Sequence, residues 1–87
     1  MSYQVRLRRA VQKQLDKLAA NDYEIVAEAI SALEQEPRPH GVKKLAESGL
    51  WRTRVRRYRV VYAIDDRESL VTVVRLARRT EDTYKRL

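Results

Sequence analysis

Residues 50–64 read Leu-Trp-Arg-Thr-Arg-Val-Arg-Arg-Tyr-Arg-Val-Val-Tyr-Ala-Ile, a pattern that is typical of a β-hairpin. Apolar or small residues alternate with arginine as far as Val55, and a β-branched and aromatic run resumes at Tyr58. Arg56-Arg57 lies between the two runs and is the expected two-residue tip. The segment therefore predicts two antiparallel strands joined by a tight, positively charged turn.

The register of this hairpin determines which side chains share a face. Pairing across the tip places Arg54 opposite Arg59 and Arg52 opposite Val61, so the three arginines lie on one face. The other face carries Trp51, Thr53, Val55, Tyr58, Val60 and Tyr62. That second face is largely apolar, and we expect helices to pack on it.

The rest of the chain supplies the other elements of an α+β fold. Residues 3–7 alternate as a strand, and from Arg9 to Leu33 two apolar stripes at helical spacing predict a helical hairpin, with Asn21 and Asp22 capping its second helix. Pro37 to Gly41 is a connector, because each proline disfavours helix. We expect a single domain over residues 1–87: an N-terminal strand, the helical hairpin packed on one face of the sheet, a three-stranded antiparallel meander, and a short C-terminal helix.

The third strand of the meander, residues 70–76, follows a polar turn. A tip centred on Asp66-Arg67, with no bulge in the strand, places Val74 beside Arg59 and projects Arg78 from the arginine face. Four arginines are then expected to converge with no acidic side chain among them.

Composition narrows the classes of function. The chain has 87 residues, 19 Lys and Arg against 12 Asp and Glu, and a net charge of +7, which favours an anionic partner. No cysteine and one histidine argue against a disulfide scaffold and a zinc site. No run is apolar enough for a signal peptide or a membrane span, so we expect a cytoplasmic protein with no membrane partner.

Simpler interpretations compete at each candidate site. The arginines of an exposed sheet face are often only solvated, but like charges directly opposite are destabilising, and this favours polyanion binding. His40 is interpreted as a loop residue and not as a base. Asp65, Asp66 and Glu68 are interpreted as turn formers and not as a metal site.

The segment from Gly49 to Asp66 resembles the RelE/ParE superfamily of toxins from type II toxin–antitoxin systems, most closely the RelE branch. Pro37-Arg38-Pro39 leading to Lys43-Lys44-Leu45 supports the resemblance upstream. Val74-Arg75-Leu76-Ala77-Arg78-Arg79 followed by Tyr84 supports it downstream. The resemblance covers essentially the whole chain.

The resemblance implies a toxin that a cognate antitoxin neutralises and that cleaves mRNA on the ribosome. In the RelE branch the 2′-hydroxyl attacks the adjacent phosphate and leaves a cyclic phosphate and a free 5′-hydroxyl. Neither a metal nor another cofactor is implied. The partners implied are the antitoxin, the ribosome and mRNA.

The family's functional residues carry over by position. Arg52 and Arg54 match basic residues that contact the scissile region, and Arg59 matches an arginine that stabilises the transition state. Arg78 matches the group that protonates the leaving oxygen, and Tyr84 an aromatic residue that orients the nucleotide or, alternatively, anchors the C-terminal helix. The remaining basic residues expected to contact mRNA or rRNA are Lys43, Lys44, Arg56, Arg57 and Arg79.

Three departures from the family pattern qualify these roles. Arginine stands where relatives often have lysine at one of the first two positions, and its pKa above 12 makes it a poor general base. The tip Arg56-Arg57 lacks the glycine that relatives often have there. An extra residue before Tyr84 leaves Arg78 and Arg79 interchangeable as the acid. The alternatives are a ParE-like inhibitor of DNA gyrase without nuclease activity and a catalytically inactive nucleic-acid-binding relative.

Overall fold

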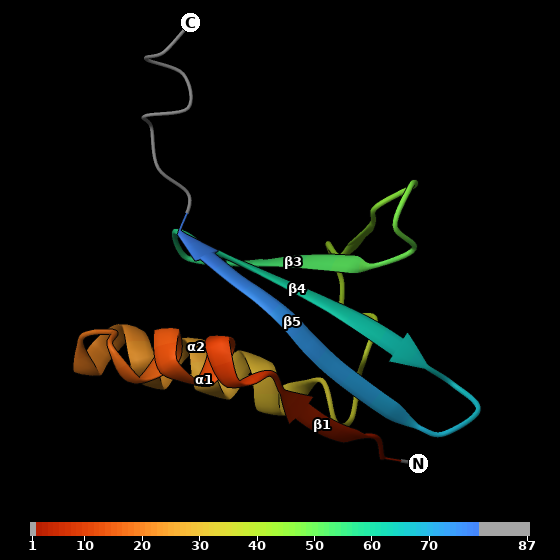
Figure 1. The fold of residues 1–87 in the computed structure, drawn as a ribbon, viewed down its shortest axis with the longest axis horizontal. Coiled ribbons are helices and arrows are strands. Elements are labelled where there is room, and N and C mark those ends of the chain that lie inside the picture. The colour runs from red at the N-terminus through yellow and green to blue at the C-terminus, as the bar shows by residue number, and fades with distance from the viewer. Residues whose placement is uncertain (1, 79–87) are drawn as a thin grey trace, which may run out of the picture.

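The structure is a computed structural model that describes residues 2–78, and it confirms the α+β class (Figure 1). Its elements follow in the order β1 (Gln4–Leu7), α1 (Arg9–Asp16), α2 (Ala20–Ala32), β2 (Lys43–Lys44), β3 (Trp51–Val55), β4 (Tyr58–Asp65) and β5 (Leu70–Arg78). The predicted C-terminal helix lies outside the described residues.

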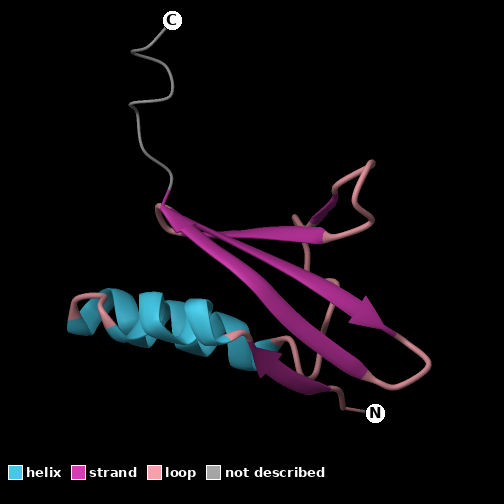
Figure 2. Ribbon diagram, in the orientation of Figure 1, coloured by secondary structure: helices cyan, strands magenta, loops and turns pink. Residues whose placement is uncertain are grey.

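The strands form one five-stranded sheet in the order β1-β5-β4-β3-β2 (Figure 2). β1 runs parallel to β5, because the two helices carry the chain back between them, and all the other neighbours are antiparallel. The two-residue strand β2 was not predicted. It adds Lys43 and Lys44 to the edge of the sheet beside β3.

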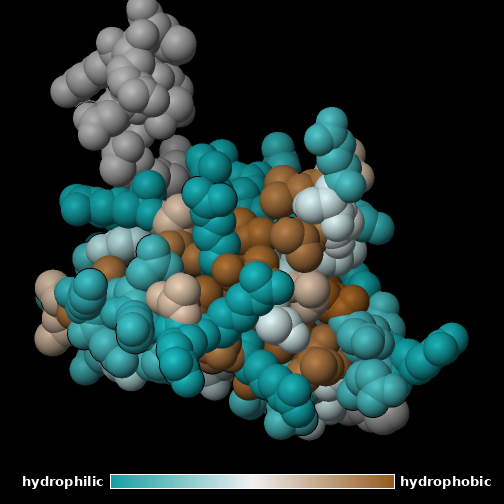
Figure 3. All heavy atoms as spheres, viewed as in Figure 1, coloured by the Kyte–Doolittle hydropathy of each residue, from teal (hydrophilic) through white to brown (hydrophobic). Residues whose placement is uncertain are grey.

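The core lies between the helices and one face of the sheet. α1 contributes Val11 and Leu15, and α2 contributes Val26 and Ile30, with Leu33 just beyond its end. The sheet contributes Tyr58, Val60, Tyr62, Val71, Val73 and Leu76. In Figure 3 the visible apolar atoms gather in the middle of the molecule and hydrophilic side chains surround them. The predicted apolar face of the hairpin is therefore the face on which the helices pack.

The start of the second helix differs from the prediction. α2 begins at Ala20 after Ala19, and no side chain caps its free amides. Asn21 and Asp22 lie inside the first turn, so the predicted capping role is wrong. The carboxylate of Asp22 instead accepts a hydrogen bond of 2.9 Å from the hydroxyl of Tyr58, and its charge suits the positive end of the helix dipole.

The β4–β5 pairing also differs from the prediction, in two ways. The turn contains four residues, 66–69, because Asp65 pairs with Leu70. A β-bulge then inserts Val74, since Tyr62 pairs with Val73 but Val61 pairs with Arg75. Arg59 therefore lies beside Ala77 and not beside Val74.

None of the helices in residues 2–78 is long and apolar enough to cross a lipid bilayer.

Candidate functional site

The predicted arginine face of the β3–β4 hairpin is confirmed. Arg54 pairs with Arg59 and Arg52 pairs with Val61, as the hairpin register predicts. The three arginines lie on the face of the sheet opposite the helices, because Tyr58 and Val60, at alternating positions, are buried against the helical layer. Arg54 and Arg59 are exposed, and Arg52 is half-buried.

The hairpin tip adds two more positive charges beside this face. Arg56 and Arg57 form the predicted two-residue turn and are both exposed. Arg56 has a φ of 56°, in the region that glycine adopts most readily. A bulky arginine in that conformation carries strain of about 1 kcal/mol. The strain is local to the charged tip.

The prediction that Arg78 joins the arginine face is wrong. Arg78 pairs with Tyr58, whose side chain points toward the helices, so the register places Arg78 on the helix side of the sheet. There it lines a surface hollow with Lys17, Asp22 and Tyr58. The cause is the bulge at Val74, because one extra residue in a strand reverses the faces of all residues beyond it.

The same bulge brings Arg75 onto the arginine face, which the sequence analysis missed. Arg75 pairs with Val61 from the β5 side, while Arg52 pairs with Val61 from the β3 side. On the far side of Arg52 lies Lys43, its partner in β2. A row therefore crosses four strands as Lys43, Arg52, Val61 and Arg75.

The missed signal is the spacing of polar residues in β5. Thr72 and Arg75 are both partly or fully exposed, yet they are three residues apart, and a regular strand would put them on opposite faces. Val71, Val73 and Leu76 are all buried on the helix side. A bulge between Val73 and Leu76 satisfies both observations.

Acidic side chains are remote from the arginine cluster on this face. Along β4, Asp65 is the acidic residue on the same side as Arg59, six residues away, which corresponds to about 20 Å at the rise of a strand. Asp65 accepts a hydrogen bond of 3.0 Å from the backbone amide of Glu68. The interpretation of Asp65 as a turn former is therefore confirmed. Among residues 2–78, no three acidic or histidine side chains are grouped in a way that could hold a metal ion.

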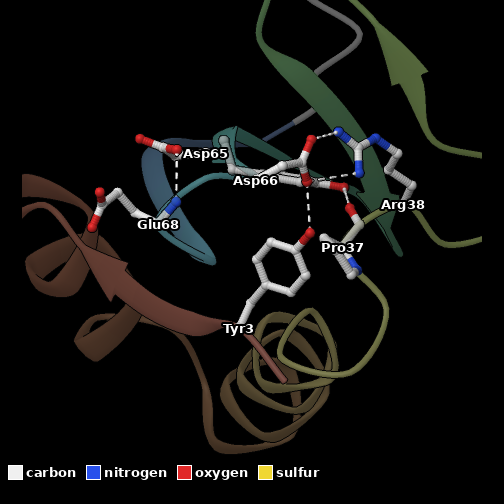
Figure 4. Close-up of polar contacts among 7 residues, drawn as sticks. Tyr3, Pro37, Arg38, Asp65, Asp66 and Glu68 are labelled. Carbon is white, nitrogen blue, oxygen red and sulfur yellow. Dashed lines mark hydrogen bonds and ion pairs between the residues drawn. The ribbon is translucent and has the colours of Figure 1, made fainter. Parts of the chain in front are cut away.

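A second polar cluster fastens the connector to the far end of the sheet (Figure 4). The guanidinium of Arg38 donates to both carboxylate oxygens of Asp66, at 3.3 and 2.9 Å, and the hydroxyl of Tyr3 donates to the same carboxylate at 2.6 Å. These hydrogen bonds, with that from Arg38 the larger cause, lower the pKa of Asp66. The carboxylate in turn raises the pKa of Tyr3. Asp66 is thus more than a solvent-facing turn residue.

Trp51 links this cluster to β2. Its ring lies 4.9 Å from the guanidinium carbon of Arg38 and 5.5 Å from Nζ of Lys44, both within cation–π range. The hydroxyl of buried Tyr62 donates to the carbonyl oxygen of Pro37 at 2.8 Å. The connector and β2 are therefore held against the sheet, with Lys43 beside Arg52. His40 is exposed in the connector, which fits its interpretation as a loop residue.

The arginine face can hold anions but supplies no proton-transfer group of near-neutral pKa. Its cations within residues 2–78 are guanidinium groups and the ammonium of Lys43, and guanidinium stays charged at any physiological pH. The paired planar forks match the oxygens of a phosphate. Two residues predicted to act with them, Arg79 and Tyr84, lie outside the described residues.

Comparison with known proteins identifies the family. The family model described as the ParE toxin of the type II toxin–antitoxin system, parDE, matches residues 5–83. A comparison with curated proteins gives no significant match to the chain.

Three solved structures are similar to this fold. A chain of the archaeal RelE–RelB complex from Pyrococcus horikoshii is 32% identical, with a TM-score of 0.82 over 91% of this chain and 97% of that chain. A chain of the toxin–antitoxin complex RelBE2 from Mycobacterium tuberculosis is 29% identical, with a TM-score of 0.80 over 91% and 100%. The isolated RelE toxin of E. coli is 20% identical and shares the fold, with a TM-score of 0.79 over 98% of both chains. The chain therefore belongs to the ParE toxin family of type II toxin–antitoxin systems, within the RelE/ParE superfamily.

Proposed function

We propose that this type II toxin, which is structurally like RelE, is a ribosome-dependent mRNA endonuclease. The observation that carries the proposal is the pairing of Arg54 directly opposite Arg59, with Arg52 one position along the same face. Placing like charges opposite one another costs stability. A phosphate bound between the two guanidinium groups offsets that cost.

The proposed chemistry is attack of a ribose 2′-hydroxyl on the adjacent phosphodiester. The new P–O bond forms as the bond to the 5′-oxygen breaks, and the products are a 2′,3′-cyclic phosphate and a free 5′-hydroxyl. Negative charge grows on the phosphate oxygens in the transition state, and fixed positive groups stabilise it most strongly where water is excluded. In this scheme Arg59 stabilises the transition state, and Arg52 and Arg54 hold the scissile phosphate.

Proton transfer in this scheme is assigned outside the arginine face. The proton of the 2′-hydroxyl passes to a phosphate oxygen or to water, because guanidinium is already fully protonated. Arg79 is the proposed donor to the leaving oxygen and Tyr84 the proposed nucleotide-orienting aromatic. Arg78 is the less suitable donor, since its strand position faces the helices. Lys43, Lys44, Arg56 and Arg57 are proposed to contact RNA.

Primer extension on an mRNA translated in a purified system tests the proposal. The wild-type toxin is expected to produce cuts that need the ribosome, and Arg59→Ala is expected to remove them. Arg67→Ala is the matched control, because Arg67 is an exposed arginine in the β4–β5 turn. Ribosome-dependent cuts that survive in the Arg59→Ala variant would refute the site, and the absence of cuts by the wild type would refute the activity.

A second candidate function is inhibition of DNA gyrase without nuclease activity. The match of the ParE toxin model to residues 5–83 favours it. A supercoiling assay with purified gyrase separates the two candidates, since only the second predicts inhibition by the isolated toxin. Both targets place the proposed action in the cytoplasm.

We also propose a cognate antitoxin as partner. Two of the similar structures are toxin–antitoxin complexes, from P. horikoshii and M. tuberculosis. With a net charge of +7 on 87 residues, this toxin favours an acidic antitoxin. Co-purification with the product of an adjacent small acidic reading frame is the direct check.

A further inference from the structure

The row that crosses the sheet at Val61 carries three cations that point away from the helices. Lys43, Arg52, Val61 and Arg75 are successive register partners on β2, β3, β4 and β5. Neighbouring strands are about 4.8 Å apart, so the backbone positions of Arg52 and Arg75 are separated by about 10 Å with Val61 between them. Lys43 continues the row on the other side of Arg52.

Val61 shows how the flanking arginines lie. Only 7% of it is exposed, although it is on the face that the helices do not cover. Long arginine side chains bury apolar surface along their aliphatic stems while the charged head stays in water. Stems from Arg52 and Arg75 on either side account for the burial of Val61. The two guanidinium groups are thereby held beside one another over the middle of the face.

Arg75 has this position only because of the bulge at Val74. Without the extra residue, Arg75 would point into the core between the sheet and the helices, and Arg78 would lie on the arginine face. A bulge interrupts the hydrogen-bond ladder, and bulges recur where a strand re-aims a side chain next to a functional site. Within residues 2–78, neither Arg52 nor Arg75 makes an ion pair with a carboxylate.

We infer that Lys43, Arg52 and Arg75 form a binding row for the phosphates of an RNA backbone, one register step from the Arg54–Arg59 pair. The inference deepens the proposed function and rests on it: the pair acts on the scissile phosphate and the row holds neighbouring phosphates. Two residues along a strand separate them by about 7 Å. Arginine forks suit phosphate better than they suit the isolated carboxylates of an acidic peptide, because phosphate offers oxygens to more than one fork. Arg75 is then an RNA-binding residue, and no proton-transfer role is assigned to it.

Binding at varied salt concentration tests the row directly. The variants are Arg75→Gln, which keeps an uncharged stem over Val61, and Arg75→Lys, which restores the charge. Arg67→Gln is the control, because it removes one exposed arginine charge in the turn away from the row. The probes are a fluorescent single-stranded RNA oligonucleotide, intact ribosomes, and poly-L-glutamate as an acidic peptide. Circular dichroism checks that each variant is folded.

We expect R75Q to bind RNA about tenfold more weakly at low salt, and to lower the slope of log K against log salt by about 0.7 for the single strand. R75K restores the slope, and R67Q leaves it unchanged. In the cleavage assay R75Q raises KM and leaves kcat near the wild-type value, because the row binds RNA and does not take part in the chemistry. Loss with the oligonucleotide assigns the row to mRNA, and loss with ribosomes alone assigns it to rRNA.

Three results would overturn the row. They are a salt slope for R75Q equal to that of R67Q, a fall in kcat at unchanged KM, and weakened binding of poly-glutamate with unchanged binding of RNA. Failure of the proposed function gives a different pattern. A wild-type toxin that cleaves no mRNA, but whose RNA binding still depends on Arg75, refutes the nuclease and leaves the row in place.

Discussion

Replacing Arg59 with glutamine is expected to abolish cleavage and, at low ionic strength, to stabilise the fold. Arg59 and Arg54 are direct register partners and both are exposed. Two unit charges about 5 Å apart in water repel by about 0.8 kcal/mol, and flexible side chains relieve part of this. We expect Arg59→Gln to raise the free energy of unfolding by about 0.5 kcal/mol, within the range measured for cross-strand pairs.

The cost to activity is larger than this gain in stability. Removing one preorganised donor to a developing oxyanion typically lowers kcat by about 10²–10³. For a domain of this size, the stability gain corresponds to a rise of about 2–4 °C in Tm. The two effects have opposite signs, which separates a functional arginine from one that simply supports the fold.

Urea denaturation, followed by the fluorescence of Trp51, measures the stability change. Urea is chosen because guanidinium chloride is a salt and screens the repulsion under study. The gain is expected at 20 mM NaCl and is expected to disappear at 1 M, where the screening length is about 3 Å. Arg67→Gln removes one positive charge without an opposing partner and controls for the change in net charge.

The reasoning fails if R67Q gains as much stability as R59Q, since the effect would then be one of net charge. It fails equally if the gain persists in 1 M salt. Full cleavage activity in R59Q would refute the role of Arg59 in the proposed chemistry, whatever its stability.

Two further predictions concern the residues that fasten the connector. Tyr62→Phe removes the hydrogen bond to the carbonyl of Pro37 and is expected to cost about 1 kcal/mol at pH 7. Burial raises the pKa of Tyr62 from 10.0 to about 12, so its contribution is present below pH 10 and lost as pH rises towards 12; urea melts of wild type should show this loss and those of Y62F should lack it. Asp66→Asn removes the carboxylate whose pKa is lowered by Arg38 and Tyr3, a contribution that is present above the usual pKa of 3.8 and lost as pH falls below it. Unfolding curves at pH 6 and pH 3 should therefore show a smaller acid loss for D66N than for wild type, and equal losses would contradict the assignment.

The β3–β4 hairpin could be predicted from the sequence because local patterns determine it. Strict alternation around Arg54 and a two-residue tip leave one register that buries Val55 and Tyr58 on the same side. The start of α2 was predicted less well. Asn21 and Asp22 suit a helix cap, but Asp22 is used inside the first turn by Tyr58, which is 36 residues away and invisible to a local pattern.

Two other features depend on contacts between distant parts of the chain. β2 has only two residues, and Lys43 and Lys44 have no apolar alternation that would mark a strand. The strand exists because Lys44 lies over Trp51, Arg38 stacks on the same ring, and Asp66 holds Arg38 from the opposite end of the sheet. Each of these contacts is weak by itself at the surface, and together they fix the connector.

The composition of the site itself depends on one residue, Val74. Val71, Val73 and Leu76 must all face the helices to fill the core, and a strand with a period of two cannot bury the first two together with the third. An extra residue between Val73 and Leu76 resolves the conflict, so the bulge is a consequence of burying these three side chains. Once it is present, Arg75 must join the arginine face and Arg78 must leave it. The requirement of the core on one side of β5 therefore selects which arginine is offered to RNA on the other.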